Sequence, residues 1–239
     1  MEWNRTKLIE NRLESILKNG LYQGRHLIRR DSPIDGGVYL GGGRREAIVV
    51  NSQNSSLIEY VYAKAKKMVD SAKKSPLEDP LKEDPAKENP LEENLSAKEN
   101  PEKFILMTTY NIVRDYLTYS EKEVDKIILK HNAYEDKKIS LGVFIGEGYG
   151  VCRHQALLAG FLLERFIKEG YLQGKVSIDR NSLLSAHAWC RYTSEDGKVT
   201  IIDPAQGFFG SLEKSLEKLS WEYHRKEDEK EEREREKKK

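Results

Sequence analysis

The chain has 239 residues, of which 41 are basic and 40 acidic, giving a formal net charge of +1 at pH 7. This balance provides no overall positive field, and it therefore argues against nucleic acid and anionic membranes as partners. Hydrophobic residues make up 38% and charged residues 34% of the chain. Because the charges are concentrated in two stretches, the globular core is expected to be smaller than the chain.

The sequence also bears on the compartment. Two cysteines in different contexts, Cys152 and Cys190, cannot build a disulfide framework, which suits a reducing compartment. No apolar run approaches the roughly 20 residues needed to cross a bilayer. Glu2, Arg5 and Lys7 lie where a signal peptide needs an apolar segment. We therefore expect a soluble, cytoplasmic protein without a signal peptide or transmembrane segment.

Residues 1–72 predict a helix, a hairpin and a second helix packed on the core. Apolar residues at helical spacing indicate the first helix from about 3 to 18, and residues 38–40 and 48–50 flank three glycines as a hairpin. The glycines lack the ending of a phosphate-binding loop, so we interpret them as a turn. In the second helix, from about 56 to 72, one apolar face carries Leu57, Tyr60, Val61, Ala65 and Met68.

Two segments have a composition that does not favour a core. In residues 73–101, proline recurs after four or five residues from Pro76 to Pro90 among glutamate and lysine, and Pro101 closes the segment, which predicts a disordered insert. Docking of a protein partner on this insert is the alternative. Residues 213–239 become almost purely charged with mixed signs, which predicts a charged helical or disordered tail.

The core is expected over residues 102–212. Two helices are predicted at about 102–118 and 120–131, with Ser120 and Glu123 as a capping box for the second. A strongly apolar helix begins at Cys152 and ends before Gly170, and strands are predicted around 185–192 and 199–203.

Cys152 is the candidate nucleophile. It follows Gly148 and Gly150 and opens the apolar helix. The positive end of a helix and a nearby imidazolium both favour a thiolate, and the backbone N–H of a residue in the first turn can hold an oxyanion. The alternative is a small apolar side chain that happens to be cysteine.

His187 and Asp203 are the candidate base and its orienting acid. A three-residue loop with Gly197 in the left-handed region would pair residue 194 with 198, and hence 189 with 203. His187 and Asp203 would then be diagonal neighbours on one face of the sheet, close enough for a hydrogen bond from Nδ1 to the carboxylate. A two-residue loop would instead place them on opposite faces, and each residue alone has a structural reading.

The other candidates receive structural roles. His154 lies two residues after Cys152 on the same helix, so its side chain points away from the thiol. Cys190 faces opposite to His187 by strand alternation and is expected to be a buried structural thiol. No Cys/His cluster has zinc spacing and no acidic loop resembles a calcium site, so neither a metal nor another cofactor is expected.

Three segments together resemble the core of the transglutaminase-like superfamily. They are Gly-Val-Cys-Arg-His-Gln-Ala-Leu at 150–157, Ala-His-Ala-Trp at 186–189 and Ile-Asp-Pro at 202–204, and the resemblance covers roughly residues 104–206. It implies a papain-like α+β fold in which a central helix carries the nucleophile Cys152 and an antiparallel sheet carries His187 and Asp203. It further implies an upstream aromatic or amide donor in the oxyanion hole, for which Tyr110 and Tyr116 are the candidates.

The resemblance implies a function class rather than one reaction. Members include cross-linking transglutaminases, deamidases, peptidases and peptide N-glycanases, whose cysteine attacks a carbonyl carbon. We therefore predict a cysteine-dependent acyl-transfer enzyme of protease, deamidase or transglutaminase type, whose substrate is a peptide or protein amide. The first segment also resembles a regulatory region of some plant Raf-like kinases. This keeps a catalytically inactive binding or regulatory module as the alternative.

Overall fold

The computed structural model describes residues 11, 14–41, 45–74, 100–181, 186–218, 222–225 and 227–228. Most of the helix predicted at 3–18, nearly all of the insert predicted at 73–101 and much of the tail lie outside these residues. The described part has an α+β fold, as predicted, with separate helices and mostly antiparallel sheets. Among the described helices, none has the length and apolar character required to cross a membrane.

A four-stranded antiparallel sheet carries two of the three candidate catalytic residues. Its strand order is β11-β10-β9-β8. The strands are β8 (Gly174–Asn181), β9 (His187–Ser194), β10 (Val199–Asp203) and β11 (Phe208–Ser211). The short 3-10 helix η2 (Pro204–Gln206) joins β10 to β11, and helix α7 (Leu212–Lys218) follows β11.

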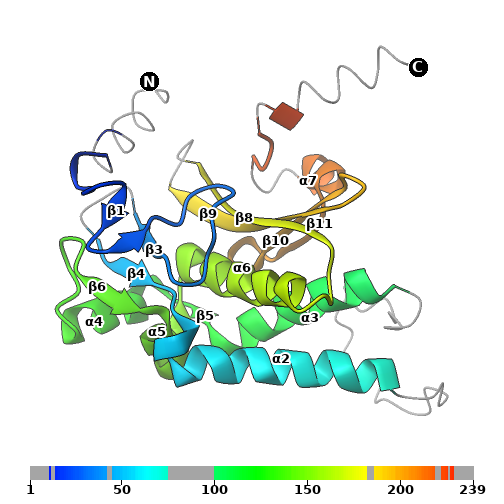
Figure 1. Ribbon diagram of the computed structural model, residues 1–239, viewed down its shortest axis with the longest axis horizontal. Helices are drawn as coiled ribbons and strands as arrows, with labels where there is room; N and C mark the ends of the chain where they lie inside the picture. Colours follow the sequence, from blue (N-terminus) through cyan, green and yellow to red (C-terminus); the bar gives the residue numbers. More distant parts are fainter. Residues whose placement is uncertain are drawn as a thin grey trace.

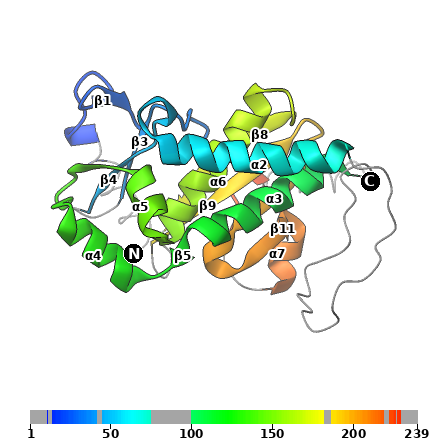
Figure 2. The same ribbon diagram turned by 90° about the horizontal axis from the view of Figure 1, so that it is seen from below.

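Helix α6 (Cys152–Lys168) occupies the centre of the molecule, between this sheet and helices α2 (Ser56–Lys74) and α3 (Pro101–Tyr116) (Figure 1; Figure 2). Every residue from 153 to 163 is buried. A helix that is apolar on most sides can be accommodated only where other elements cover it all round. The apolar sequence after Cys152 therefore explains why α6 is central.

Gly160 allows α6 to approach the sheet closely. A Cβ atom at this position would lie 2.6 Å from Cδ1 of both Ile34 and Ile178. Both side chains are buried in the main core, where packing leaves little room for movement.

Replacing Gly160 by alanine is accordingly expected to lower the free energy of unfolding by about 1–3 kcal/mol, since overpacking outweighs the gain in helix propensity. The control is Gly146→Ala in α5 (Leu141–Glu147), where the new Cβ would meet only Cδ1 of the partly exposed Leu57. Urea unfolding measures both variants. Equal stability of the two would contradict the close packing of α6 on the sheet.

Helix α2 forms as predicted, but its buried face differs from the predicted one. Val61 and Ala65 are buried, whereas Leu57, Tyr60 and Met68 are 41%, 59% and 45% exposed. The buried stripe is instead Ile58, Val61, Tyr62, Ala65 and Val69. Two adjacent faces of this helix are apolar, and its contacts with α3, α5 and α6 decide which of them is covered.

The remaining elements precede α6 in the chain. The predicted hairpin is confirmed, because β3 (Val38–Leu40) pairs antiparallel with β4 (Ala47–Val49), and β6 (Lys138–Ser140) joins β4 in parallel. Ser120 caps α4 (Glu121–Lys130) by accepting a hydrogen bond from the backbone N–H of Glu123. The short elements are β1 (Leu21–Tyr22), β2 (Arg25–His26), the 3-10 helix η1 (Ser52–Asn54), β5 (Thr118–Tyr119) and β7 (Tyr149–Gly150).

The β9–β10 hairpin has the predicted register. The backbone N–H of Ser194 donates to Lys198 O at 2.9 Å, and Gly197 has φ +81° in the left-handed region. Ile202 pairs with Cys190, and the same register continues to Asp203 opposite Trp189. The turn sequence therefore determines which face of the sheet His187 and Asp203 share.

Candidate active site

Cys152 is the first residue of α6 and is partly exposed. Strand β7, which pairs in parallel with β5, leads the chain into it. At Gly150 a Cβ atom would lie 3.0 Å from His154 Cβ and 3.4 Å from Leu117 Cβ, so glycine here lets β7 pack closely against these two side chains. The thiol thus lies at the positive end of a rigid, buried helix.

His187 and Asp203 contact each other through their side chains. His187 Nε2 lies 2.5 Å from Asp203 Oδ2, and the side chains are 5% and 1% exposed. The predicted nitrogen was wrong, because Nε2 rather than Nδ1 contacts the carboxylate. The residue opposite Asp203 is Trp189, and His187 precedes it by two positions on β9. Nε2 is the ring nitrogen farther from the backbone, and it therefore reaches the carboxylate across this distance. This arrangement leaves Nδ1 for the thiol.

The thiol and the imidazole shift each other's pKa. Burial by itself raises the pKa of the Cys152 thiol, but a hydrogen bond to His187, the charge of that ring and a backbone hydrogen bond from Ala188 outweigh it, so the pKa is lowered. Burial by itself lowers the pKa of His187, but hydrogen bonds to Asp203 and Cys152 raise it to about 9. Both shifts favour the thiolate form of Cys152 beside a protonated His187 ring.

Asp203 is held on both oxygens. Oδ1 accepts a hydrogen bond from the backbone N–H of Gln206 at 3.2 Å, in the first turn of η2. Oδ2, which contacts His187, also accepts a hydrogen bond from the Tyr223 hydroxyl at 2.9 Å. The Trp189 ring stacks on the His187 ring, with 5.9 Å between the centroids.

A buried ion pair supports the first turn of α6. Arg153 Nε lies 2.5 Å from Oε1 of Glu46, a residue that precedes β4 and is 1% exposed. Burial alone raises the pKa of Glu46, but the bond to His154 and the charge of Arg153 lower it to about 2. The carboxylate therefore remains ionised and links the N-terminal hairpin to α6.

His154 is fully buried and holds the backbone at Val151, the residue before Cys152. Burial and the charge of Arg153 lower its pKa to about 4, so the ring is neutral at pH 7. Its Nδ1 accepts a hydrogen bond from the Val151 N–H at 3.1 Å, which places the proton on Nε2, 3.3 Å from Glu46 Oε1. As predicted, His154 is a core residue.

The two tyrosines proposed for the oxyanion hole occupy different places. Tyr110 is buried on α3, and the charge of Asp203 is among the influences on its pKa, which burial raises. Tyr116 instead contacts α2, with its ring centroid 6.4 Å from that of Tyr60 and 4.9 Å from Lys64 Nζ. The structure thus places Tyr110 near Asp203, whereas Tyr116 contacts α2.

Tyr119 lies near the thiol although the sequence did not single it out. Burial raises its pKa to about 12, with the charge of Cys152 as the next cause, and its hydroxyl contacts Glu121 Oε1 at 3.2 Å. The pairing of β5 with β7 places Tyr119 opposite Gly150. Tyr119 is therefore placed by the parallel pairing of β5 with β7. Strands of only two residues leave no recognisable pattern in a sequence, so this position could not be predicted.

Cys190 differs from Cys152 in its surroundings. It is completely buried on β9, on the face opposite to His187, and burial strongly raises the pKa of its thiol. This agrees with the expected structural thiol. In the described ranges, no group of three or more His, Cys, Asp or Glu side chains is placed to hold a metal ion.

The site therefore combines a thiol with a lowered pKa, an imidazolium hydrogen-bonded to it and a buried carboxylate that orients the ring. Such a set can attack a carbonyl carbon and protonate a leaving group. No known family model, curated protein or solved structure matches the chain.

Proposed function

We propose that the protein is a transglutaminase-like cysteine enzyme that cleaves or exchanges the amide bond of a peptide or protein substrate. The observation that supports this most is the joint placement of Cys152, His187 and Asp203 on a central helix and an adjacent antiparallel sheet. This arrangement is the one expected of a papain-like core. We also propose a cytoplasmic location, in which a reducing environment would keep the Cys152 thiol free.

The reaction would proceed in two halves. The Cys152 thiolate attacks the amide carbonyl carbon, a C–S bond forms and the carbonyl electrons move to oxygen. The backbone N–H at the start of α6 is suited to stabilise this oxyanion. Collapse of the intermediate breaks the C–N bond, and the amine leaves with the proton of the His187 imidazolium. A thioester with Cys152 remains.

The acceptor would decide the outcome of the second half. His187, now neutral, takes a proton from water or from a primary amine as that molecule attacks the thioester, and the Cys152 thiolate is released. Water gives a peptidase or a deamidase, whereas an amine gives a cross-linking enzyme. The same three side chains serve both outcomes. Residues outside the triad, which control whether water or an amine reaches the thioester, would therefore select between hydrolysis and cross-linking.

The proposal is tested by trapping the thioester with an activated ester, which requires little substrate recognition. After incubation with the p-nitrophenyl ester of an N-acylated amino acid, mass spectrometry should find one acyl group on Cys152 and none on Cys190. Addition of a primary amine would reveal whether transfer competes with hydrolysis. A folded protein without an adduct on Cys152 would contradict the proposal and favour a binding module with the same fold.

The pH dependence should differ between esters and amides. Acylation by the ester is expected to rise with pH below the ordinary thiol pKa of about 8.5 and to stay high above pH 9, because p-nitrophenolate leaves without a proton. Turnover of an amide should rise in the same way but fall as pH passes about 9, where His187 loses its proton. Parallel pH profiles for the two substrates would contradict the role of His187 as the acid.

A further inference from the structure

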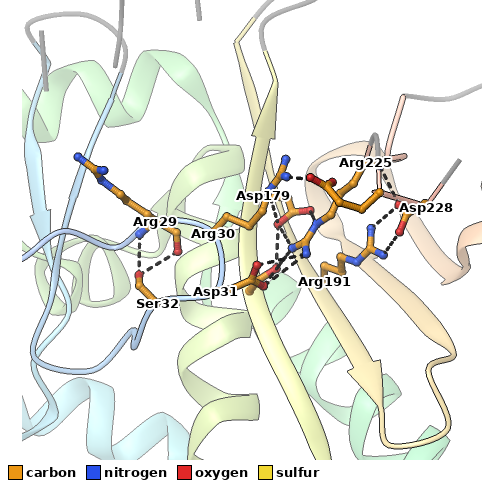
Figure 3. Close-up of polar contacts among 10 residues, drawn as sticks. Arg29, Arg30, Asp31, Ser32, Asp179, Arg191, Arg225 and Asp228 are labelled. Carbon is orange, nitrogen blue, oxygen red and sulfur yellow. Dashed lines mark hydrogen bonds and ion pairs between the residues drawn. The ribbon is translucent and has the colours of Figure 1, made fainter. Parts of the chain in front are cut away.

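The described C-terminal residues 222–225 and 227–228 lie against the four-stranded sheet although the sequence there is mostly charged. We call these residues the clasp. Asn181 at the end of β8 donates a hydrogen bond to Glu222 O at 2.8 Å. Arg225 and Asp228 contact charged side chains of β8 and β9 (Figure 3). The segment is therefore fixed at several points along its length.

The first anchor of the clasp is Arg225. Its Nε and Nη2 lie 2.7 and 2.6 Å from the two oxygens of Asp179, and Nη2 also donates to Ser177 Oγ at 2.5 Å. Asp179 is on β8 and is 1% exposed. A buried carboxylate is costly without a paired cation. Arg225 is the close partner of Asp179, whereas Arg30 Nε lies 3.9 Å from its Oδ1.

The second anchor is Asp228, which pairs with a buried cation. Its two oxygens accept hydrogen bonds from Nη1 and Nη2 of Arg191 at 2.8 and 2.6 Å, and Arg191 is 4% exposed. Asp228 also accepts a hydrogen bond from the backbone N–H of Arg225 at 2.7 Å. This bidentate geometry is directional, so the two anchors together define where the clasp lies on the sheet.

Tyr223 lies just before these two anchors in the chain, and its side chain contacts Asp203. It is completely buried, with its ring centroid 5.2 Å from that of Trp189 and 5.3 Å from that of Phe208. Its hydroxyl donates to Asp203 Oδ2 at 2.9 Å, the same oxygen that contacts His187 Nε2. A residue of the tail thus completes the hydrogen-bonding of the triad acid.

We propose that Tyr223 is a positioning residue of the active site, which the clasp holds in place so that Asp203 presents Oδ2 to His187. This inference rests on the proposed function, because it assigns Tyr223 a role in the same triad. The titratable groups near His187 and Asp203 are Cys152 on α6, Tyr110 on α3 and Tyr223 in the clasp. Of these, Tyr223 alone belongs to the tail.

The test compares Tyr223→Phe with Tyr192→Phe in the full chain. Tyr192 is also completely buried, and its hydroxyl contacts Glu102 Oε2 at 2.9 Å and Gln173 O at 2.5 Å, away from the triad. Both variants lose one buried hydroxyl, so both should lose some stability. The rate of iodoacetamide alkylation at Cys152, followed across pH by mass spectrometry, separates the triad effect from this shared loss.

The midpoint of alkylation in Tyr223→Phe should move to higher pH by about 0.5–1 unit, the size expected when a carboxylate orients its partner less well. Tyr192→Phe should keep the wild-type midpoint. An unchanged midpoint in Tyr223→Phe, or a move to lower pH, would overturn the inference. A lower midpoint would mean that the hydroxyl only weakens the charge of Asp203.

Arg225→Gln provides a second variant that leaves Tyr223 and Asp203 intact. It should move the midpoint in the same direction as Tyr223→Phe, because the clasp loses its first anchor. A wild-type midpoint in this variant would overturn the role of the clasp. If Cys152 in the wild type reacts no faster than a free thiol and His187→Ala changes nothing, the proposed function itself fails, which is a different result.

Discussion

Replacing His187 by alanine is expected to slow acylation of Cys152 at pH 7 by about 10³-fold. The imidazolium supplies the hydrogen bond and the positive charge that lower the thiol pKa, so its loss leaves burial to raise that pKa. The size of the p-nitrophenolate burst and its rate measure the effect with an activated ester, independently of substrate recognition.

His131→Ala is the matched control for this variant. His131 caps the end of α4 and is exposed, so its removal should leave the burst unchanged. A His187→Ala protein that acylates within a few-fold of the wild-type rate would contradict the assignment of His187 as base and acid. Thermal unfolding of both variants verifies that the fold is retained.

Replacing Glu46 by alanine is expected to lower the free energy of unfolding by about 3–5 kcal/mol at pH 7, because Arg153 would keep a buried charge without its partner. The folded-state pKa of Glu46 is about 2, below its ordinary value of 4.5. Its contribution is therefore fully present above pH 4.5 and is lost as pH falls towards 2. The difference between wild type and Glu46→Ala should accordingly shrink between pH 5 and pH 3.

Urea unfolding at the two pH values measures this prediction, and Glu147→Ala serves as its control. Glu147 pairs with Lys130 at 2.6 Å on the surface, with side chains 37% and 65% exposed. Exposed pairs of this kind contribute little to stability, so the control should unfold like the wild type. A Glu46→Ala protein that matches the control at pH 7 would contradict the structural role of the buried pair.

The part of the site that could be predicted from the sequence depends on local rules. The apolar residues after Cys152 require a buried helix, and the glycine at 197 sets a hairpin loop that fixes the register of β9 and β10. That register places His187 and Asp203 on one face. Which ring nitrogen meets the carboxylate depends on side-chain rotation, and register does not determine it.

The residues that the sequence did not single out act across long separations. Glu46 reaches Arg153 over 107 positions, and Tyr223 reaches Asp203 from the charged tail over 20 positions. Neither lies in a periodic or motif-bearing segment, and an acidic residue before a strand or a tyrosine in a charged tail suggests a solvent-exposed side chain. Their burial depends on how α6 and the sheet pack, which only the tertiary structure reveals.

The same limit explains the error in α2. Leu57, Tyr60 and Met68 follow helical spacing as well as the buried residues do, so periodicity alone does not choose between the two apolar faces. The choice depends on the position of α3, α5 and α6 around the helix.

The central claim is that Cys152 is a thiolate held by His187, and alkylation by iodoacetamide across pH tests it most directly. Cys190 is an internal reference, because it is completely buried and its thiol pKa is raised. The account predicts that Cys152 reacts rapidly and selectively at pH values well below 8.5, and that His187→Ala removes this advantage. Slow and equal reaction of the two thiols, unaffected by His187→Ala, would contradict it.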